Sequence, residues 1–458
     1  MNRATWLKLI AVGLATAGGN IQKEEVSMNR ATWLKLIAVG LATAGLFFLG
    51  VACAPAPTIE EVPPPPAEEE VAPAEEPGIV AEEGAELTVW ESEDASGEWL
   101  QDVAKLFTEK YGIPVTFEPV AHIDAPGKLK TDGPAGLGAD VFAAPHDHVG
   151  SMVAGGLIYP NDVSDPADFV DAAVAGVSFQ GIMYGYPIGI ETYALLYNKD
   201  LVDELPETWD ELIEFAAEFN DIPNNRFGFM MEPANFYYVY AFIGGHGGYV
   251  FGDGNTNPDD IGLNNAGAIE GAKFLQRLKG ILPLHTADIT YDIKAGLFND
   301  GNLAFNLDGP WAVAGHRDAG VNFGVVPLPI LPNGERPTSF SGIRSLFVSS
   351  FTEYPMASKL FAQFVTSKEL LAKRFTDTGQ LPPRFDLVDD PAITADPIAA
   401  AFLQQTQYAV PMPSIPEMMH VWGPMATALD LIWNEGGDPK PVLDKAVQHI
   451  KDAIELAR

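Results

Sequence analysis

The chain has 458 residues, one cysteine and a formal net charge of −35. Such acidity excludes binding to nucleic acid or to an anionic membrane surface through the overall field, because like charges repel. It also argues, more weakly, against an anionic ligand. Since Cys53 is the single cysteine, an internal disulfide is excluded as well.

The N-terminal region contains the segment MNRATWLKLIAVGLATAG twice, at residues 1–18 and 28–45. Each copy has a short basic start followed by an apolar run, which is the pattern of a secretory signal peptide. A membrane-spanning helix is the alternative, because the second run approaches the roughly 20 residues that cross a bilayer. We interpret residues 28–52 as the signal peptide and residues 1–27 as a duplicated copy that follows a misplaced start.

The second apolar run ends in LGVAC, at Cys53. This ending is similar to a lipobox, in which the chain is cut before the cysteine and the new N-terminus carries a lipid. Gly50 departs from the aliphatic residue usual at its position, so a tail without lipid is the alternative. Residues 53–85 consist mainly of proline, alanine and glutamate, which predicts a disordered tether. We therefore expect an exported protein, anchored by lipid at the outer face of the cytoplasmic membrane or periplasmic.

Strands and helices alternate from residue 86 onward. A strand is expected at 86–90 and a helix at 96–112, with Gly112 as its C-cap. The apolar face of this helix is expected to contain Trp99, Val103, Leu106 and Phe107. Further strands are expected at 113–119, 139–145, 302–309 and 323–329, and further helices at 208–219, 266–280 and 354–367. Thr208 and Glu211 have the spacing of a capping box. This alternation over roughly 370 residues predicts α/β domains, two by default, with mostly parallel sheets.

A series of motifs follows one another between Leu87 and the C-terminus. They are LTVWESEDASGEWL, GIPVTFE, ADVFAAPHDHVG, YPIGIETYALLYNKDLV, PETWDEL, GLNNAGAIEGAKFL, FNDGNLAFNLDGPWA and MPSIPEMMHVWGPM. In this order and spacing they resemble the maltose/maltodextrin-binding proteins, which are the extracellular solute-binding proteins of carbohydrate ABC transporters. One such motif alone would be a weak signal, whereas their common order covers nearly the whole globular part.

The resemblance implies an α/β protein with the two-lobed periplasmic-binding-protein fold, type II-like, whose lobes are joined by a hinge crossed three times. It implies an N-lobe formed by residues 86–190 and 346–390, and a C-lobe formed by residues 191–340 and 396–458. It further implies a monomeric receptor that closes around an oligosaccharide and delivers it to ABC-transporter permease subunits. No cofactor and no metal are implied.

The expected site follows from the chemistry of sugars. Their hydroxyl groups call for charged acceptors, because charge-assisted hydrogen bonds are strong, and their flat faces call for aromatic rings. The resemblance assigns the acceptor role to Asp94, Glu118, Asp147, Glu191 and Glu232. It assigns the aromatic role to Tyr237, Tyr238, Tyr291, Trp311 and Trp422. Phe236 is the alternative aromatic residue in this segment, because the Glu-Pro-aromatic unit of the family is two residues longer in MEPANFYYVYAF.

Structural roles are the alternative for several of these residues. An exposed carboxylate after a strand, such as Asp94, is often a helix cap. A tryptophan after a strand, such as Trp311, can also be a buried core residue. Trp90, Trp99 and Trp209 are assigned to the core and left out of the site.

Some positions depart from the better-known maltose receptors. Ala144 stands in place of a stacking tryptophan, His148 in place of a basic residue and Ala95 in place of a lysine. All lie on the expected N-lobe side, so this edge of the site should be smaller and less basic. We hypothesise a ligand held chiefly by C-lobe aromatic residues, such as a maltodextrin, a cyclodextrin, trehalose or a galacto-oligosaccharide.

Other functions have weaker support in the sequence. The run HDH at 146–148 has no accompanying His/Cys cluster for a metal. Glu191 and Glu232 could form a glycosidase pair if roughly 5–10 Å apart, but no other feature indicates a secreted hydrolase. A receptor for a non-sugar solute, and a lipoprotein that presents ligand to a sensor, remain alternatives.

Overall fold

The computed structural model describes residues 79–458. The expected signal peptide, its duplicate and Cys53 lie outside the described residues, as does the tether as far as residue 78. Within the described part, no helix is both long and apolar enough to cross a membrane.

The described chain begins on the surface of helix α13 (Pro355–Val365). The Glu82 carboxylate accepts hydrogen bonds from the backbone N–H groups of Met356 at 2.8 Å and Ala357 at 2.9 Å. The first N–H groups of a helix have no partner inside it, and a carboxylate there satisfies them. The end of the segment that the sequence assigns to a tether is therefore attached to the globular part.

A six-stranded sheet contains the first strands of the protein. Its strands are β1 (Leu87–Glu91), β2 (Val115–Pro119), β3 (Val141–Pro145), β6 (Tyr186–Glu191), β12 (Phe340–Val348) and β13 (Val410–Pro411). Their order is β13-β12-β3-β1-β2, and β6 pairs with β12 outside this path. β1 runs parallel to β2 and β3, whereas β12 runs antiparallel to β3 and β6.

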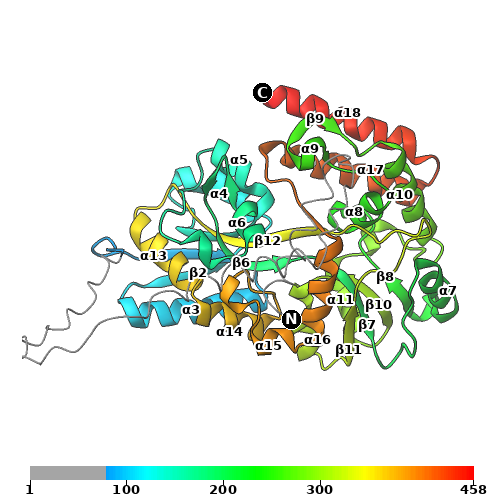
Figure 1. Cartoon of the computed structure of the whole chain (residues 1–458), viewed down its shortest axis with the longest axis horizontal. Helices are drawn as coiled ribbons and strands as arrows, with labels where there is room; N and C mark the ends of the chain where they lie inside the picture. The colour runs from blue at the N-terminus through cyan, green and yellow to red at the C-terminus, as the bar shows by residue number, and fades with distance from the viewer. Residues whose placement is uncertain (1–78) are drawn as a thin grey trace, which may run out of the picture. The chain divides into compact units, whose positions relative to one another are not determined.

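Helices cover both faces of this sheet (Figure 1). Val89 and Val141 pack in the core cluster that contains α3 (Ala95–Tyr111), α13 and α14 (Lys368–Thr378). The next residue on each strand, Trp90 and Phe142, packs in a second cluster with α4 (Ala125–Asp132) and α5 (Val149–Ala154). This division follows from the alternation of side chains along a strand.

A four-stranded sheet carries the second part of the fold. Its strands are β7 (Ala194–Asn198), β8 (Phe227–Met230), β10 (Leu303–Asp308) and β11 (Phe323–Val326), in the order β11-β7-β10-β8. Its helices include α7 (Trp209–Phe219), α8 (Phe236–Gly245), α10 (Ala266–Leu278), α11 (Tyr291–Asn299), α12 (Val313–Asp318), α16 (Pro397–Gln405), α17 (Trp422–Glu435) and α18 (Pro439–Ala457). The remaining strands and α-helices of residues 79–458 are β4 (Ser178–Phe179), β5 (Ile182–Met183), β9 (Asn257–Ile261), α6 (Asp171–Gly176), α9 (Gly252–Asn255) and α15 (Pro391–Thr394).

Both sheets are mixed. In the first, β1, β2 and β3 run parallel and β13 runs parallel to β12, so the prediction of mostly parallel sheets holds there, but it was wrong for the second sheet. β10 runs parallel to β8 but antiparallel to β7, and β11 also runs antiparallel to β7. The reason lies in how the chain passes between the sheets. β6 leaves the first sheet only a few residues before β7 enters the second, and β12 brings the chain back in the opposite direction.

The structure tests the predicted capping box of α7 and the predicted C-cap and apolar face of α3. The capping box is confirmed: Oγ1 of Thr208 accepts from the N–H of Glu211, whose side chain accepts from the N–H of Thr208. Gly112 is confirmed as the C-cap of α3 with a left-handed φ of 71°. Leu106 is wrong as a core residue, because its side chain is 42 % exposed. The buried face of α3 instead consists of Trp99, Leu100, Val103, Ala104 and Phe107, together with Ser96 and Gly97.

The tryptophans assigned to the core are confirmed there, since Trp90, Trp99 and Trp209 are at most 2 % exposed.

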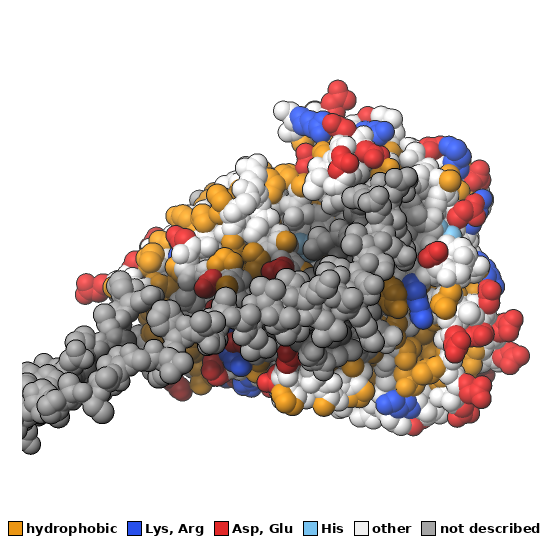
Figure 2. Space-filling view, viewed as in Figure 1, with side chains coloured by type: hydrophobic (Ala, Val, Ile, Leu, Met, Phe, Trp, Pro, Cys, Tyr) orange, Lys and Arg blue, Asp and Glu red, His pale blue; other side chains and the backbone are white. Residues whose placement is uncertain are grey.

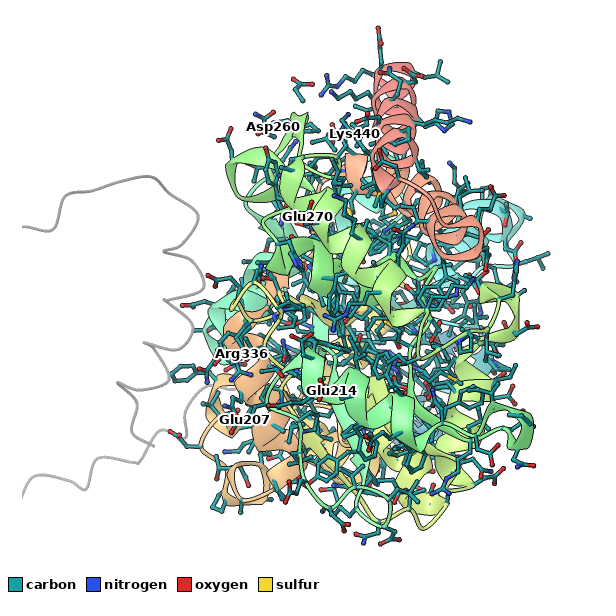
Figure 3. All side chains as sticks on the ribbon, turned by 90° about the vertical axis from the view of Figure 1, so that its right-hand side faces the viewer. Glu207, Glu214, Asp260, Glu270, Arg336 and Lys440 are labelled. Atoms are coloured by element: carbon teal, nitrogen blue, oxygen red, sulfur yellow. The ribbon has the colours of Figure 1, made fainter. Side chains whose placement is uncertain are left out.

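Figure 2 shows acidic side chains along the outer edge of the visible face, many of them around α7, α10 and α18. Figure 3 shows the side that carries these helices, where Glu214, Glu270 and Lys440 come from α7, α10 and α18 in that order.

Candidate ligand-binding site

Tyr237 lies at the centre of a group of aromatic rings at the start of α8. The helix begins after Asn235, whose side chain accepts a hydrogen bond from the N–H of Tyr237 at 3.1 Å. The ring centroid of Tyr237 lies 6.1 Å from that of Trp311 and 5.6 Å from that of Tyr238. It also lies 6.1 Å from the ring of Phe340, the first residue of β12. The structure therefore brings three of the expected aromatic residues together.

Trp422 joins this group from the beginning of α17. Its ring centroid lies 5.7 Å from that of Phe236 and 6.1 Å from that of Phe340. The indole Nε1 of Trp422 donates a hydrogen bond of 3.1 Å to Oδ2 of Asp147, which lies in the turn after β3. The Asp147 side chain is buried, and its Oδ1 has no hydrogen-bond partner among residues 79–458.

Arg344, a buried residue on β12, gathers acidic residues of the first sheet. Its guanidinium donates to the buried carboxylate of Glu91, and its Nη2 lies 3.9 Å from Oδ2 of Asp94. Its Nη1 lies 3.7 Å from Oε1 of Glu191. Burial opposes the charge of this arginine, but Glu91 and Glu191 hold the pKa of Arg344 above its ordinary value. Burial raises the pKa of the Glu191 carboxyl, and Arg344 and Arg374 act against this rise.

Asp94 has two neighbours of different kinds. Its Oδ1 accepts hydrogen bonds from the N–H groups of Ser96 at 2.7 Å and Gly97 at 3.3 Å, which makes it the N-cap of α3. Its other oxygen faces Arg344, and the side chain is 40 % exposed. The helix cap that the sequence offered as an alternative is therefore present, together with the exposure that a ligand contact requires.

A second buried cation, Lys294 on α11, gathers residues of the second sheet. Its Nζ lies 3.0 Å from Oδ2 of Asp308 and 3.6 Å from Oε1 of Glu232. The same ammonium lies 4.7 Å from the ring centroid of Tyr238 and 5.8 Å from that of Tyr291. Tyr291, the first residue of α11, is 39 % exposed. Three expected site residues thus meet around one lysine.

The charged groups and the aromatic group influence one another. After burial, the charge of Glu191 is the largest cause that raises the pKa of Tyr237. Burial, Asp308 and Asp94 together raise the pKa of Tyr291. The candidate residues from both sheets therefore lie within electrostatic reach of one another.

Glu118 is an expected site residue whose hydrogen bond comes from outside the candidate set. It is exposed near the end of the edge strand β2, where its Oε2 accepts a hydrogen bond of 2.8 Å from the indole Nε1 of Trp90. Among the described residues, no hydrogen bond, ion pair or ring contact joins Glu118 to the other candidates.

Sequence reasoning missed several residues that organise the site. They are Glu91, Lys294, Asp308, Phe340 and Arg344. A weak signal existed for Arg344, because it is the charged residue of the otherwise uncharged strand FSGIRSLFV. Arg344 also changes the expectation of a less basic N-lobe edge. The lysine that the family resemblance implies is replaced by Ala95, but Arg344 places a cation 3.9 Å from Asp94.

The HDH run has a structural role at its first histidine. The ring of His146 is buried, its Nδ1 accepts from the N–H of Ile343 at 3.0 Å, and its Nε2 bonds the carbonyl oxygen of Met412 at 3.1 Å. The two ring nitrogens therefore connect β3 to the backbone of β12 and of the segment after β13. Over residues 79–458, no group of three or more His, Cys, Asp or Glu residues is arranged to hold a metal ion.

The chain forms two sheets that are covered by helices, and it passes from the first sheet to the second and back. Acidic and aromatic residues of both halves gather in one region. These features define a two-lobed solute-binding protein. The chain belongs to the family described as bacterial extracellular solute-binding protein, whose model matches residues 102–401.

Individual relatives agree with this assignment. The galactooligosaccharide-binding protein of Bacillus subtilis is 33 % identical over 382 residues, which cover 81 % of this chain and 90 % of the relative. A maltooligosaccharide ABC transporter solute-binding lipoprotein of Streptococcus pneumoniae is 30 % identical over 377 residues, covering 81 % and 89 %. A crystal structure of a cyclo/maltodextrin-binding protein complexed with maltotetraose is 37 % identical, with a TM-score of 0.68, and covers 81 % of this chain and 97 % of that one. The resemblance inferred from the motifs is confirmed.

Proposed function

We propose that this protein is an extracytoplasmic receptor that binds a neutral oligosaccharide between its lobes and delivers it to the permease of an ABC importer. The names of its relatives support a ligand of the maltodextrin or galacto-oligosaccharide class. The proposed contacts come from Asp94, Asp147, Glu191, Glu232, Tyr237, Tyr238, Tyr291, Trp311 and Trp422. Glu118 is left out, because the hydrogen bond to its carboxylate in the described part of the chain comes from Trp90 and not from another candidate residue.

The observation that carries the proposal is a set of buried carboxylate oxygens beside aromatic rings. Oδ1 of Asp147 and Oε1 of Glu191 are buried without a hydrogen-bond partner in the described part of the chain. Buried polar atoms are nearly always hydrogen-bonded, so these oxygens are suited to accept from a ligand's hydroxyl groups. The neighbouring rings of Trp422 and Tyr237 supply flat apolar area of the kind that packs on a sugar face.

The charge of the region supports a neutral ligand. Arg344 and Lys294 are both occupied by carboxylates of the protein, with Glu91 and Asp308 as their buried partners. An anionic ligand would therefore meet further acidic groups rather than an available cation.

We propose binding rather than catalysis. Glu191 and Glu232, the pair that a glycosidase would need, each contact a buried cation of their own. The family and the relatives described above are binding proteins by name. Cys53 is proposed as the lipid attachment point, in keeping with the relative that is a lipoprotein.

We propose that the permease recognises the closed arrangement of the lobes. A ligand can drive closure only if it binds the closed arrangement more tightly than the open one. Contacts from both sheets to one ligand provide such a difference, because the open arrangement would offer only part of them.

The test is a thermal-shift and calorimetric screen of the purified protein. The panel contains maltotetraose, a cyclodextrin, a galacto-oligosaccharide, trehalose and a set of amino acids as non-sugar controls. A ligand at about 100 times its Kd adds roughly 2.7 kcal/mol to the free energy of unfolding, which raises the melting temperature visibly. Binding of an oligosaccharide without any hydrolysis product supports the proposal. Stabilisation by an amino acid alone, or the appearance of shortened sugars, would contradict it.

A further inference from the structure

Lys294 is a buried charge in the second sheet's half of the candidate site. It lies one helical turn after the start of α11, and its side chain is fully buried. A buried ammonium costs free energy unless it is paired and hydrogen-bonded, so the identity of its partners indicates what it does.

The partners of Lys294 are all protein groups. Nζ donates to the carbonyl oxygen of Leu307 at 2.8 Å, lies 3.0 Å from Oδ2 of Asp308 and lies 3.6 Å from Oε1 of Glu232. The carbonyl oxygen of Leu307 accepts a hydrogen bond from the ammonium, and the two carboxylates pair with it as ions, so protein oxygens surround Nζ. Because the lysine side chain is fully buried, a ligand would not contact it directly.

Asp308 is a buried counter-ion. Its Oδ1 accepts from the N–H of Gly309 at 2.9 Å and from the hydroxyl of Tyr238 at 3.4 Å. Its Oδ2 accepts from the amide of Asn306 at 3.2 Å and faces Lys294. Both carboxylate oxygens interact with groups of the protein, so Asp308 contacts Lys294 and Tyr238 rather than a ligand.

Among the three charged residues Lys294, Asp308 and Glu232, Glu232 is the one that reaches the surface. Its side chain is 19 % exposed, while that of Lys294 is not exposed at all. Its Oε2 accepts from the amide of Asn235, the N-cap of α8, at 3.3 Å. The ammonium therefore pairs with one oxygen of Glu232, and the partly exposed carboxylate lies at the edge of the buried region. Tyr238 and Tyr291 pack their rings toward the same ammonium.

We propose that Lys294 is a positioning residue for ligand recognition, which holds Glu232, Tyr238 and Tyr291 in one arrangement. This inference rests on the proposed function, because it concerns the same site. The competing explanation is an ion pair between Lys294 and Asp308 that only stabilises the fold. The two explanations differ in what happens to the ligand when both charges of the pair are removed together.

The key variant is Lys294→Met/Asp308→Asn in the full chain. Lys294→Met alone would leave Asp308 buried and unpaired, which is strongly destabilising, so it reports on folding rather than binding. In the double variant an asparagine can keep the bonds to Gly309 and Tyr238, and Asn306 can turn its amide to accept from it. Lys359→Met is the matched control, because Lys359 is also largely buried and pairs with Asp162, which is not a candidate site residue.

The readouts are the melting temperature and the Kd for maltotetraose and for a galacto-oligosaccharide, measured by calorimetry. We expect the double variant to fold and to bind the preferred sugar at least about tenfold more weakly, the scale of one charge-assisted hydrogen bond. This loss should shrink in a Glu232→Gln background, whereas Lys359→Met should keep the wild-type Kd. A double variant that binds like the wild type, or an equal loss with and without Glu232, would overturn the proposal.

Failure of the proposed function gives a different result. If the wild type binds no sugar of the panel, the receptor proposal fails, and the positioning role is then tested without ligand. A crystal structure of the double variant should show the Glu232 carboxylate turned away from its wild-type position. An unchanged Glu232 would overturn the role of Lys294.

Discussion

The indole of Trp422 donates a hydrogen bond of 3.1 Å to the carboxylate of Asp147. These residues are 275 positions apart in the chain. One begins a helix of the second half of the fold, and the other follows a strand of the first sheet. The bond engages one oxygen of Asp147, and the other, Oδ1, has no hydrogen-bond partner among residues 79–458.

Replacing Trp422 by phenylalanine should weaken ligand binding. The variant keeps an aromatic ring but loses the donor that holds Asp147 in place, and we expect a loss of roughly tenfold in Kd, about 1.4 kcal/mol. Calorimetry with the best sugar of the panel measures the change. Trp433→Phe is the matched control on the same helix, because its indole bonds the carbonyl of Leu284 instead. It should lower stability without changing Kd; equal effects of both variants would contradict the assignment.

Replacing Trp311 by alanine should remove a stacking surface. Its ring lies beside Tyr237, and truncation of a central aromatic residue in a binding site typically costs about 2 kcal/mol, roughly 30-fold in Kd. Trp311→Phe should retain most of the affinity. An unchanged Kd in Trp311→Ala would remove this residue from the site.

Replacing Glu118 by glutamine should leave ligand affinity within about twofold, a change below 0.5 kcal/mol. Its carboxylate accepts from Trp90 and has no described contact with the other candidate residues. The measurement is the same titration as for Trp311. A large loss would show that Glu118 belongs to the site, as the family resemblance first implied.

Removing Arg344 should shift the pH dependence of binding. Burial raises the pKa of Glu191; Arg344 and Arg374 lower it, and Glu91 and Asp94 raise it. Ligand hydroxyls need the ionised carboxylate, so affinity is present above this pKa and is lost as the pH falls through it. Without Arg344 the pKa rises further, and the loss of affinity should begin at a higher pH.

The suitable variant is Arg344→Met/Glu91→Gln, because arginine removal alone would leave Glu91 buried and unpaired. Calorimetric titrations over a series of buffers, from acidic to alkaline, give the midpoint. Adding Glu191→Gln should abolish this pH-dependent step. Because Glu91 itself raises the pKa of Glu191, the reference is Glu91→Gln alone, and a midpoint in the double variant no higher than in that reference would exclude control of Glu191 by Arg344.

Replacing Thr208 by alanine should destabilise the protein without affecting binding. The hydroxyl of Thr208 accepts from the N–H of Glu211 at 3.2 Å, and loss of such a cap costs about 1 kcal/mol. Chemical denaturation measures the loss, and Thr208→Ser should restore most of it. Because α7 carries no candidate site residue, a changed Kd would be unexpected.

The sequence alone determined the local elements and the family. The capping box at Thr208, the left-handed Gly112 and the buried Trp99 and Trp209 were predictable, because each depends on neighbouring residues or on periodicity. The acidic and aromatic candidates were found through motifs, which name residues but do not show their neighbours. Leu106 shows the limit of periodicity, since an apolar residue at the border of a helix face can be exposed.

Only the tertiary structure decided which residues organise the site. Arg344 meets Glu91 across 253 residues, and it stands on a strand that returns to the first sheet after the chain has formed the second. Lys294 meets Glu232 and Asp308 only because α11 packs beside the end of β10. Charge pairing between distant segments depends on how the sheets pair and pack, and no local pattern in the sequence records that. For the same physical reason, the motif that names Glu118 does not show its hydrogen-bond donor, a tryptophan of the neighbouring strand.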